Sequence, residues 1–162
     1  MVNTDTRIRP AVETDLPLIR PLLSELMEAM VDTEGLDLDQ SVENFRILVN
    51  DPAQHVLVAV QANRILGLVN YTMRKTMMHP GPSGLIDELV VSERSRGAGI
   101  ARLLIRAVVA ECRLSGCCEL EVSTEKSNSR ARRFYKACGF EEDAVLLELD
   151  LSEPDGGPWS GL

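Results

Sequence analysis

The chain has 162 residues, of which 44% are hydrophobic and 26% charged, and its formal net charge is −8. This length predicts a single domain over residues 1–162, with a core over about residues 6–151 and a tail over residues 152–162. The composition excludes wholesale disorder, and the acidic balance argues against nucleic acid as a partner. No apolar run approaches the ~20 residues that a membrane span needs. The first residues carry no apolar segment typical of a secretory signal, so we expect a cytoplasmic protein.

The cysteines do not predict a metal site. None of the four forms a C-x-x-C pair, and the two histidines are not spaced like zinc partners. We therefore expect no bound metal.

The first third of the chain predicts one strand and two helices. The strand is expected over residues 8–11, and Thr14 is a candidate N-cap for the first helix. Apolar residues then recur at helical spacing over residues 19–30, although Pro21 is expected to kink or loosen that helix. A second helix is predicted over residues 40–49.

The rest of the chain alternates predicted strands and helices. Strands are expected over residues 56–60, 65–73, 85–91, 119–122 and 145–151, and helices over about residues 99–114 and 127–138. The resulting order is β-α-α-β-β-β-α-β-α-β. That order predicts a mixed α/β layer architecture.

An acidic segment runs from Glu28 to Glu43, with six acidic residues and no Lys or Arg. One interpretation is a solvated loop. The other is a rim that attracts a cationic substrate, with Glu34 and Asp37 as candidate acceptor-binding residues.

The most informative segment is Arg94-Ser95-Arg96-Gly97-Ala98-Gly99, which lies between a predicted strand and a predicted helix. Two glycines let the backbone turn tightly and approach a ligand, and the first amides of the helix then point at that space. Together with the helix dipole and two arginines, they predict a phosphate or pyrophosphate site. The alternative is a plain turn with solvent-facing arginines.

A dinucleotide-binding protein is one interpretation of this loop. Residues 97–102 resemble the dinucleotide fingerprint, and Glu119 or Glu121 follows at the distance of a ribose-binding acid. Against it, Arg102 replaces the third glycine, and only about sixty residues follow. The upstream hairpin also does not fit a doubly wound sheet.

A second interpretation is a family resemblance. The segment from Arg94 to Gly99 resembles the acetyl-CoA motif Arg/Gln-x-x-Gly-x-Gly/Ala of the GNAT N-acetyltransferase superfamily. The family's second motif is met downstream by Asn128, Ala131, Phe134, Tyr135, Gly139 and Phe140. The resemblance extends from the first predicted strand to the last.

The resemblance implies a splayed central sheet, a bulged strand before the glycine loop, and acetyl-CoA as co-substrate. The pyrophosphate would be held by backbone amides from Arg96 to Ala101, and Tyr135 would protonate the leaving thiolate. The implied cofactor contacts are Leu89, Val90, Val91, Arg94, Arg96, Gly97, Ala98, Gly99, Ile100, Ala101, Asn128 and Tyr135.

The proton acceptor is less certain from the residues. Glu88 is the best candidate for the base, and strand alternation places Glu88 and Asp87 on opposite faces, so that only one would face the slot. The alternatives are a sheet-face carboxylate without a proton role, or Glu34 and Asp37 acting through water. Tyr135 has its own alternative, a core tyrosine with a satisfied hydroxyl.

The sequence thus predicts an acetyl-CoA-dependent N-acetyltransferase in which a primary amine attacks directly in a ternary complex. A binding module that holds an acyl-CoA without turnover is the main alternative, and a dinucleotide-binding protein is a weaker one. The acceptor is expected to be a small molecule or peptide amine, and cationic, but its identity cannot be read from the residues. A homodimer stays open.

Overall fold

The computed structural model describes residues 5–30, 35, 37–149 and 151. Its elements are, in chain order, β1 (Arg7–Pro10), a short 3-10 helix η1 (Glu13–Asp15), α1 (Leu16–Ala29), α2 (Leu38–Asn50), β2 (Gln54–Gln61), β3 (Arg64–Arg74), β4 (Ser83–Val91), a second 3-10 helix η2 (Glu93–Ser95), α3 (Ile100–Leu114), β5 (Glu119–Val122) and α4 (Ser129–Ala137). Glu34 and the tail over residues 152–162 lie outside the described residues.

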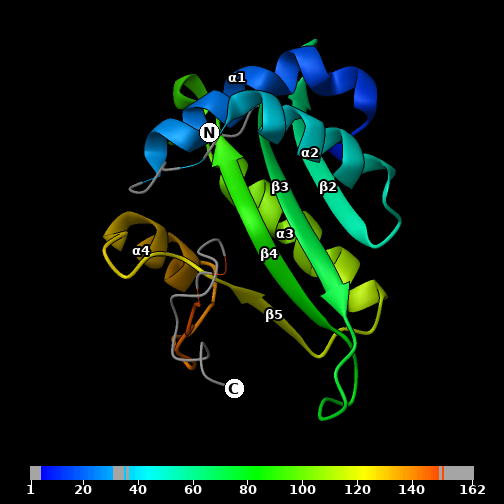
Figure 1. Cartoon of the computed structure of the whole chain (residues 1–162), viewed down its shortest axis with the longest axis vertical. Helices are drawn as coiled ribbons and strands as arrows, with labels where there is room; N and C mark the ends of the chain where they lie inside the picture. Colours follow the sequence, from blue (N-terminus) through cyan, green and yellow to red (C-terminus); the bar gives the residue numbers. More distant parts are fainter. Residues whose placement is uncertain (1–4, 31–34, 36, 150, 152–162) are drawn as a thin grey trace.

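The described strands form one mixed sheet in the order β1-β2-β3-β4-β5 (Figure 1). The first four strands are antiparallel to their neighbours. β2 and β3 form a hairpin with a tight turn at Ala62 and Asn63, whereas β1 reaches β2 through η1, α1 and α2. β5 joins β4 in parallel after the crossover through α3. The mixed α/β fold is therefore confirmed, and the doubly wound sheet of a dinucleotide-binding fold is excluded.

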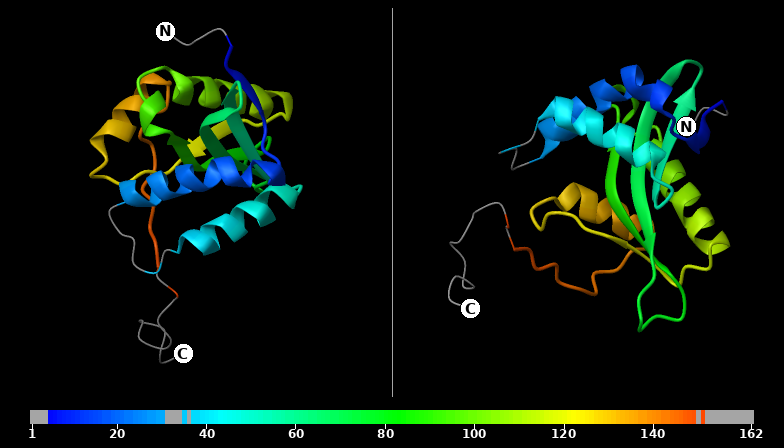
Figure 2. Two further views of the ribbon diagram at one scale, coloured as in Figure 1. Left: turned by 90° about the horizontal axis from the view of Figure 1, so that it is seen from above. Right: turned by 45° about the vertical axis from the view of Figure 1, so that its right-hand side comes forward.

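Helices cover both faces of the sheet (Figure 2). One core cluster joins α1 and α2 to the sheet through Ile19, Leu22, Phe45, Val58, Leu68 and Val90. The other cluster joins α3 to the opposite face through Leu57, Val69, Ile86, Leu104, Ile105 and Val108. Neighbouring residues of β2 enter different clusters, as the two-residue period of a strand requires. The sheet is thus buried on both faces over most of its length.

The start of α1 differs from the sequence-based prediction. Thr14 lies inside η1 and is not the cap; Asp15 is the N-cap residue of α1, and its carboxylate accepts a 3.0 Å hydrogen bond from the Val12 amide. Pro21 does not interrupt α1, which is continuous from Leu16 to Ala29. The neighbours of Pro21 on the buried face, Ile19 and Leu22, are 0% and 2% exposed, so packing holds the helix across the proline.

The prediction of a last strand at residues 145–151 is wrong for the part of that segment that the structure describes. Residues 145–149 and 151 are not in a strand, and Val145 and Leu147 are 83% and 88% exposed. An alternating apolar pattern suits a strand, but a strand forms only where a neighbour supplies its hydrogen bonds. Here the segment passes α4 and leaves the sheet (Figure 2).

Candidate functional site

The central feature of the site is a gap between β4 and β5. The two strands pair only over Ser83–Ile86 and Glu119–Val122. Beyond Ile86, β4 continues to Val91 with no strand on its β5 side among the described residues. Its backbone groups on that edge are therefore open to a ligand that pairs as a strand would. We call this gap the β4–β5 slot; it confirms the expected splay of the sheet.

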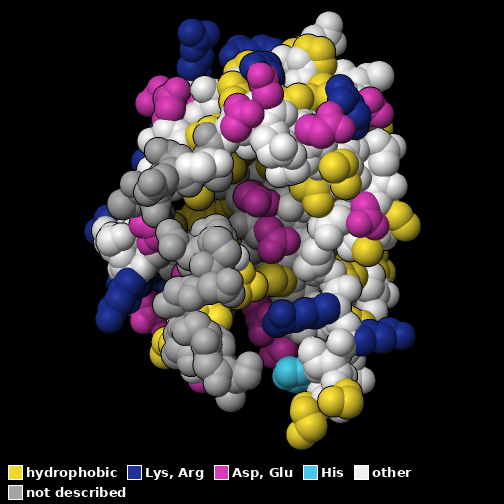
Figure 3. Space-filling view, in the orientation of Figure 1, with side chains coloured by type: hydrophobic (Ala, Val, Ile, Leu, Met, Phe, Trp, Pro, Cys, Tyr) yellow, Lys and Arg dark blue, Asp and Glu magenta, His cyan; other side chains and the backbone are white. Residues whose placement is uncertain are grey.

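A β-bulge lies where β4 leaves β5. Asn70 of β3 pairs with Glu88, whereas the next residue, Tyr71, pairs with Ile86, so Asp87 is the extra residue. The bulge interrupts the two-residue period on which the expectation that only one of the two carboxylates faces the slot was based. Asp87 and Glu88 are both exposed, and the charge of Asp87 acts on Glu88. In Figure 3, acidic side chains gather at the centre of the face where β3 and β4 are visible.

The surroundings of Glu88, the candidate base, raise the pKa of its carboxylate. The Asn70 amide donates a 2.7 Å hydrogen bond to its carboxylate. Desolvation raises the pKa of Glu88, the Asn70 hydrogen bond lowers it, and the Asp87 charge raises it; the net direction is upward. The pKa of Asp87 is also raised by desolvation, against the lowering effect of Arg74. A carboxylate with a raised pKa holds a proton more readily near neutral pH.

The glycine loop, residues 93–99, leads from β4 into α3. Gly97 and Gly99 have φ angles of +80° and +82°, a conformation that branched residues rarely adopt. A Cβ at Gly97 would meet no atom within 4 Å, so the space beside this residue is open. The loop therefore leaves room for a ligand to approach its backbone.

Several amides of this segment are free to bind an anion. Among the described residues, no acceptor is found for the amides of Gly97, Gly99, Ile100, Ala101 and Arg102. The amides of Arg96 and Ala98 donate 3.3 Å hydrogen bonds to Glu93 and Ser95 inside the loop. The donor set is thus shifted by one residue into α3 relative to the expected span of Arg96 to Ala101. Free amides at a helix N-terminus suit a pyrophosphate.

Arg96 has a different environment from the one expected for a phosphate contact. Its guanidinium donates to the Val91 carbonyl at 3.3 Å and lies 3.8 Å from Glu25 of α1 and 3.7 Å from Glu93. The Glu25 carboxylate also accepts a 2.7 Å hydrogen bond from the Glu93 amide. Arg96 and Glu25 therefore fasten the glycine loop to β4 and α1.

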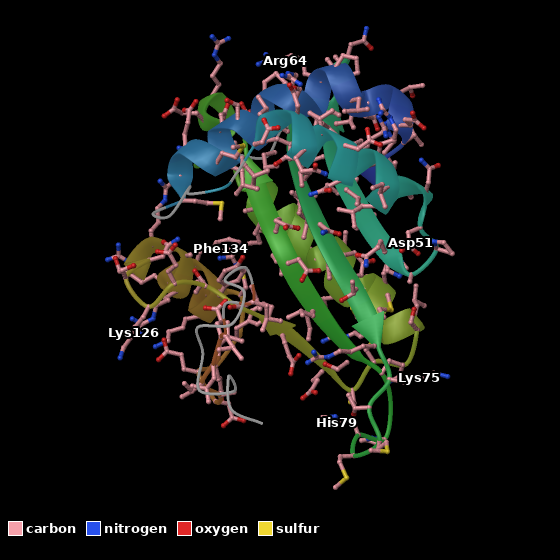
Figure 4. All side chains as sticks on the ribbon, viewed as in Figure 1. Asp51, Arg64, Lys75, His79, Lys126 and Phe134 are labelled. Carbon is pink, nitrogen blue, oxygen red and sulfur yellow. The ribbon has the colours of Figure 1, made fainter. Side chains whose placement is uncertain are left out.

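Tyr135 lies on α4, beside the β4–β5 slot. Its ring packs edge-on against Phe134 at 5.3 Å and Phe140 at 5.5 Å, and it belongs to the cluster that includes Leu89 and Val91 (Figure 4 labels Phe134). The Tyr135 hydroxyl has no hydrogen-bond partner among the described residues. It is not a buried atom that lacks a partner, so it is accessible from outside the core. Tyr135 is therefore not a core tyrosine with a hydrogen-bonded hydroxyl, which was the alternative interpretation.

Two further features bear on the role of α4. Desolvation and the neighbouring Cys138 raise the pKa of Tyr135 to about 12, so that its hydroxyl is protonated at neutral pH. Tyr71 contrasts with it: this residue is 0% exposed and donates a 2.5 Å hydrogen bond to Glu111 in the core. Asn128 caps α4 by accepting from the Ala131 amide at 3.0 Å, which leaves its side-chain NH₂ for a ligand.

In the described part of the acidic segment, the carboxylates cap a helix or form ion pairs. Asp37 caps α2 by accepting from the Asp39 amide at 3.1 Å, Asp39 pairs with Arg20 at 2.7 Å, and Glu43 pairs with Arg46 at 2.5 Å. In the sequence, no Lys or Arg lies among these acids. Helical placement brings cations from other parts of the chain to two of them.

Two residues of the site were missed from the sequence. Asn70 could have been identified from the sequence, because it is a lone amide within the apolar run of residues 65–71. Glu25 carried no signal, since it looks like any polar residue on a helix. Its contact with the glycine loop joins positions 68 residues apart.

Two other classes of site concern the described part of the chain. Within it, no group of three His, Cys, Asp or Glu residues could hold a metal ion. Nor does any described helix have the length and apolar character to cross a membrane.

Comparisons with known proteins agree with this geometry. Residues 19–140 match the sequence model of the Acetyltransferase (GNAT) family. The chain is 27% identical over 135 residues to the aminoalkylphosphonate N-acetyltransferase of Salmonella typhimurium, covering 83% of this chain and 84% of that one. It is 28% identical over 110 residues to the aminoglycoside N(6')-acetyltransferase type 1 of Stenotrophomonas maltophilia, covering 65% and 72% of the two chains.

A solved structure has the same fold. It is an aminoglycoside acetyltransferase from an uncultured soil metagenomic sample, in complex with sisomicin, with a TM-score of 0.75 and 25% identity. The similarity covers 94% of this chain and 100% of that one. With the sheet topology, the glycine loop and the family match in agreement, the chain belongs to the GNAT family of acetyltransferases.

Proposed function

We propose that the protein transfers an acetyl group from acetyl-CoA to the primary amine of a cationic small molecule or peptide, within a ternary complex. The observation that supports this proposal is that the open edge of β4 and the free amides of the glycine loop are continuous. The open edge of β4 beyond Ile86 leads directly into the free amides at Gly97 and Gly99. An extended pantetheine arm with a pyrophosphate at one end fits such an edge followed by such a loop.

The proposed chemistry divides the proton transfers between two side chains. The amine nitrogen bonds to the acetyl carbon while the carbon–sulfur bond breaks. Glu88 accepts the proton that the amine loses, directly or through water, and the Tyr135 hydroxyl gives a proton to the departing thiolate. Leu89, Val90 and Val91 would line the arm, and Asn128 would donate to it from its free NH₂. Much of the rate would come from the alignment of the two substrates in the slot.

The acceptor is proposed to be cationic. Asp87 and Glu88 share the open part of β4, and the acidic segment that contains Asp37 leads into α2. Carboxylates with little local cation raise the local concentration of a positively charged amine. Aminoglycosides, the substrate class named for one relative and for one structural neighbour, carry several such amines.

The test is an acetyl-CoA-dependent thiol-release assay over a panel of amines, which includes aminoglycosides, polyamines, aminoalkylphosphonates and peptides. Release that depends on one class of amine supports the enzyme. Calorimetry with acetyl-CoA and with NAD separates the alternatives. Tight acetyl-CoA binding without turnover of any amine would favour a binding module, and binding of NAD alone would contradict the proposal.

A homodimer in the cytoplasm is the proposed assembly and location. The support for a dimer is the exposed apolar run at Val145, Leu146, Leu147, Leu149 and Leu151. Apolar runs of this kind are typical of contact surfaces. Light scattering on the full chain and on Leu147→Asp measures the molar mass. A monomer in both proteins would reject the dimer.

A further inference from the structure

A cavity lies beside the glycine loop, between residues 94–100 and the start of β3. It has a volume of about 360 Å³ and is lined at its polar side by Arg64, Arg94, Thr6, Ser95 and Gln61. Its floor is apolar, with Leu66 and Ile100 among its residues. Arg64 starts β3, at the hairpin end of the sheet, where Figure 4 labels it. In sheet order β3 lies beyond β4 from the slot.

The charge of this cavity is unusual for the protein. No Asp or Glu lines it, although the chain carries a net charge of −8. Within the described residues, neither Arg64 nor Arg94 makes an ion pair or a side-chain hydrogen bond. Six of the other twelve arginines do have a carboxylate partner, namely Arg9, Arg20, Arg46, Arg74, Arg96 and Arg132.

The arrangement of donors suits a phosphate group. Arg64 and Leu66, both on β3, line the cavity, and Leu66 also belongs to the core cluster on the α3 face. Arg94 lines the same cavity from η2, and the Thr6 and Ser95 hydroxyls add donors to its lining. Guanidinium groups bind phosphate through paired, charge-assisted hydrogen bonds. An anion between two unpaired arginines would also relieve their mutual repulsion.

We propose that this cavity, named here the arginine cavity, binds a phosphate group at Arg64 and Arg94. This assigns the Arg94 side chain to the arginine cavity, whereas the family resemblance assigned it to the acetyl-CoA site. The inference does not rest on the proposed acetyl transfer, because it is argued from the lining of this cavity alone. Two sources of the phosphate share this chemistry: a free phosphate or phosphomonoester, and the 3′-phosphate of coenzyme A.

The test follows inorganic phosphate binding by NMR of the full chain at low salt, with and without saturating acetyl-CoA. The Thr6 amide reports on the arginine cavity, and the Gly97 and Gly99 amides report on the glycine loop. We expect Thr6 to shift saturably, and Arg64→Gln to weaken this binding on the order of 10-fold. Arg106→Gln is the control, since this exposed α3 arginine removes the same charge without lining the cavity.

The arms of the test distinguish the sources. For free phosphate, Thr6 shifts equally with and without acetyl-CoA. For the coenzyme's own phosphate, acetyl-CoA blocks the shift, and Arg64→Gln weakens acetyl-CoA but not its 3′-dephospho form. Equal phosphate binding by the Arg64 and Arg106 variants, or an unmoved Thr6, overturns the proposal. Failure to bind acetyl-CoA with an intact Thr6 response would reject the proposed function alone.

Discussion

The Asn70 side-chain amide donates a 2.7 Å hydrogen bond to the Glu88 carboxylate, across the bulge that separates β4 from β5. The carbonyl of the same Asn70 amide is buried without a partner among the described residues. A buried amide with one unsatisfied oxygen is costly, so its retention here points to the orientation of Glu88. The pair links the bulge that opens the slot to the group proposed to accept the proton.

Two variants should shift the pH dependence of turnover in opposite directions. Asp87→Asn removes a charge that raises the pKa of Glu88, so the acidic limb of kcat should move to lower pH. Asn70→Ala removes a hydrogen bond that lowers this pKa, so the limb should move to higher pH. Parallel pH–rate profiles of the three proteins measure both shifts. If the three pH–rate profiles coincide, Glu88 is not the base.

Tyr135→Phe should lower kcat on the order of 10²-fold and leave KM for acetyl-CoA nearly unchanged, because it removes a proton donor and keeps the ring packing. The matched control is Tyr71→Phe, which removes a hydroxyl that bonds to Glu111 in the core. That variant should lose stability and keep kcat. If Tyr135→Phe turns over at the wild-type rate, Tyr135 has only a packing role.

Gly97→Val should abolish acetyl-CoA binding, because a branched side chain disfavours the φ of +80° and blocks the amides. Gly116→Val is the control for backbone strain, since Gly116 has a φ of +75° at the far end of α3. Calorimetry compares the two folded variants. Loss of binding in both, or in neither, would mean that the loop geometry is not the cause.

The cationic acceptor predicts a dependence on salt. Glu34→Gln with Asp37→Asn should raise KM for the best amine and leave KM for acetyl-CoA unchanged, and added salt should have a similar effect. Asn is as good an N-cap as Asp, so α2 should survive the substitution of Asp37. Asp5→Asn removes one charge elsewhere and serves as the control. If KM for the amine changes neither with salt nor with the double substitution, the acidic segment is only a solvated loop.

Asp15→Asn should lower the free energy of unfolding by about 1–3 kcal/mol at pH 7, because the buried carboxylate serves both Arg9 and the Val12 amide. Arg9 lowers the pKa of Asp15, so this stabilisation is present above the ordinary pKa of ~3.9 and is lost as pH falls through the lowered value.

Denaturant unfolding at pH 7 and at pH 3 checks this sign, since the difference between wild type and variant should shrink in acid. Asp39→Asn is the control, because its pair with Arg20 is exposed, with side chains 78% and 48% exposed. Such a pair contributes little. An equal loss in both variants would contradict a special role for Asp15.

The sequence by itself determined the helices, the central strands and the position of the glycine loop. These are local properties: apolar periodicity selects the element type, and only glycine adopts the loop's φ angles readily. The order of Gly97, Gly99, Asn128 and Tyr135 also carried the family resemblance, which the family match over residues 19–140 bears out.

Only the tertiary structure decided which groups meet. The bulge at Asp87 depends on pairing with β3, so the simple alternation of a strand does not hold between Asp87 and Glu88. The segment at residues 145–149 had a strand pattern but found no neighbouring strand in the described structure. The contact of Glu25 with the loop and the shared cavity of Arg64 and Arg94 join positions far apart in the chain. A local pattern cannot specify such contacts, because they are fixed by the packing of helices and strands on one sheet.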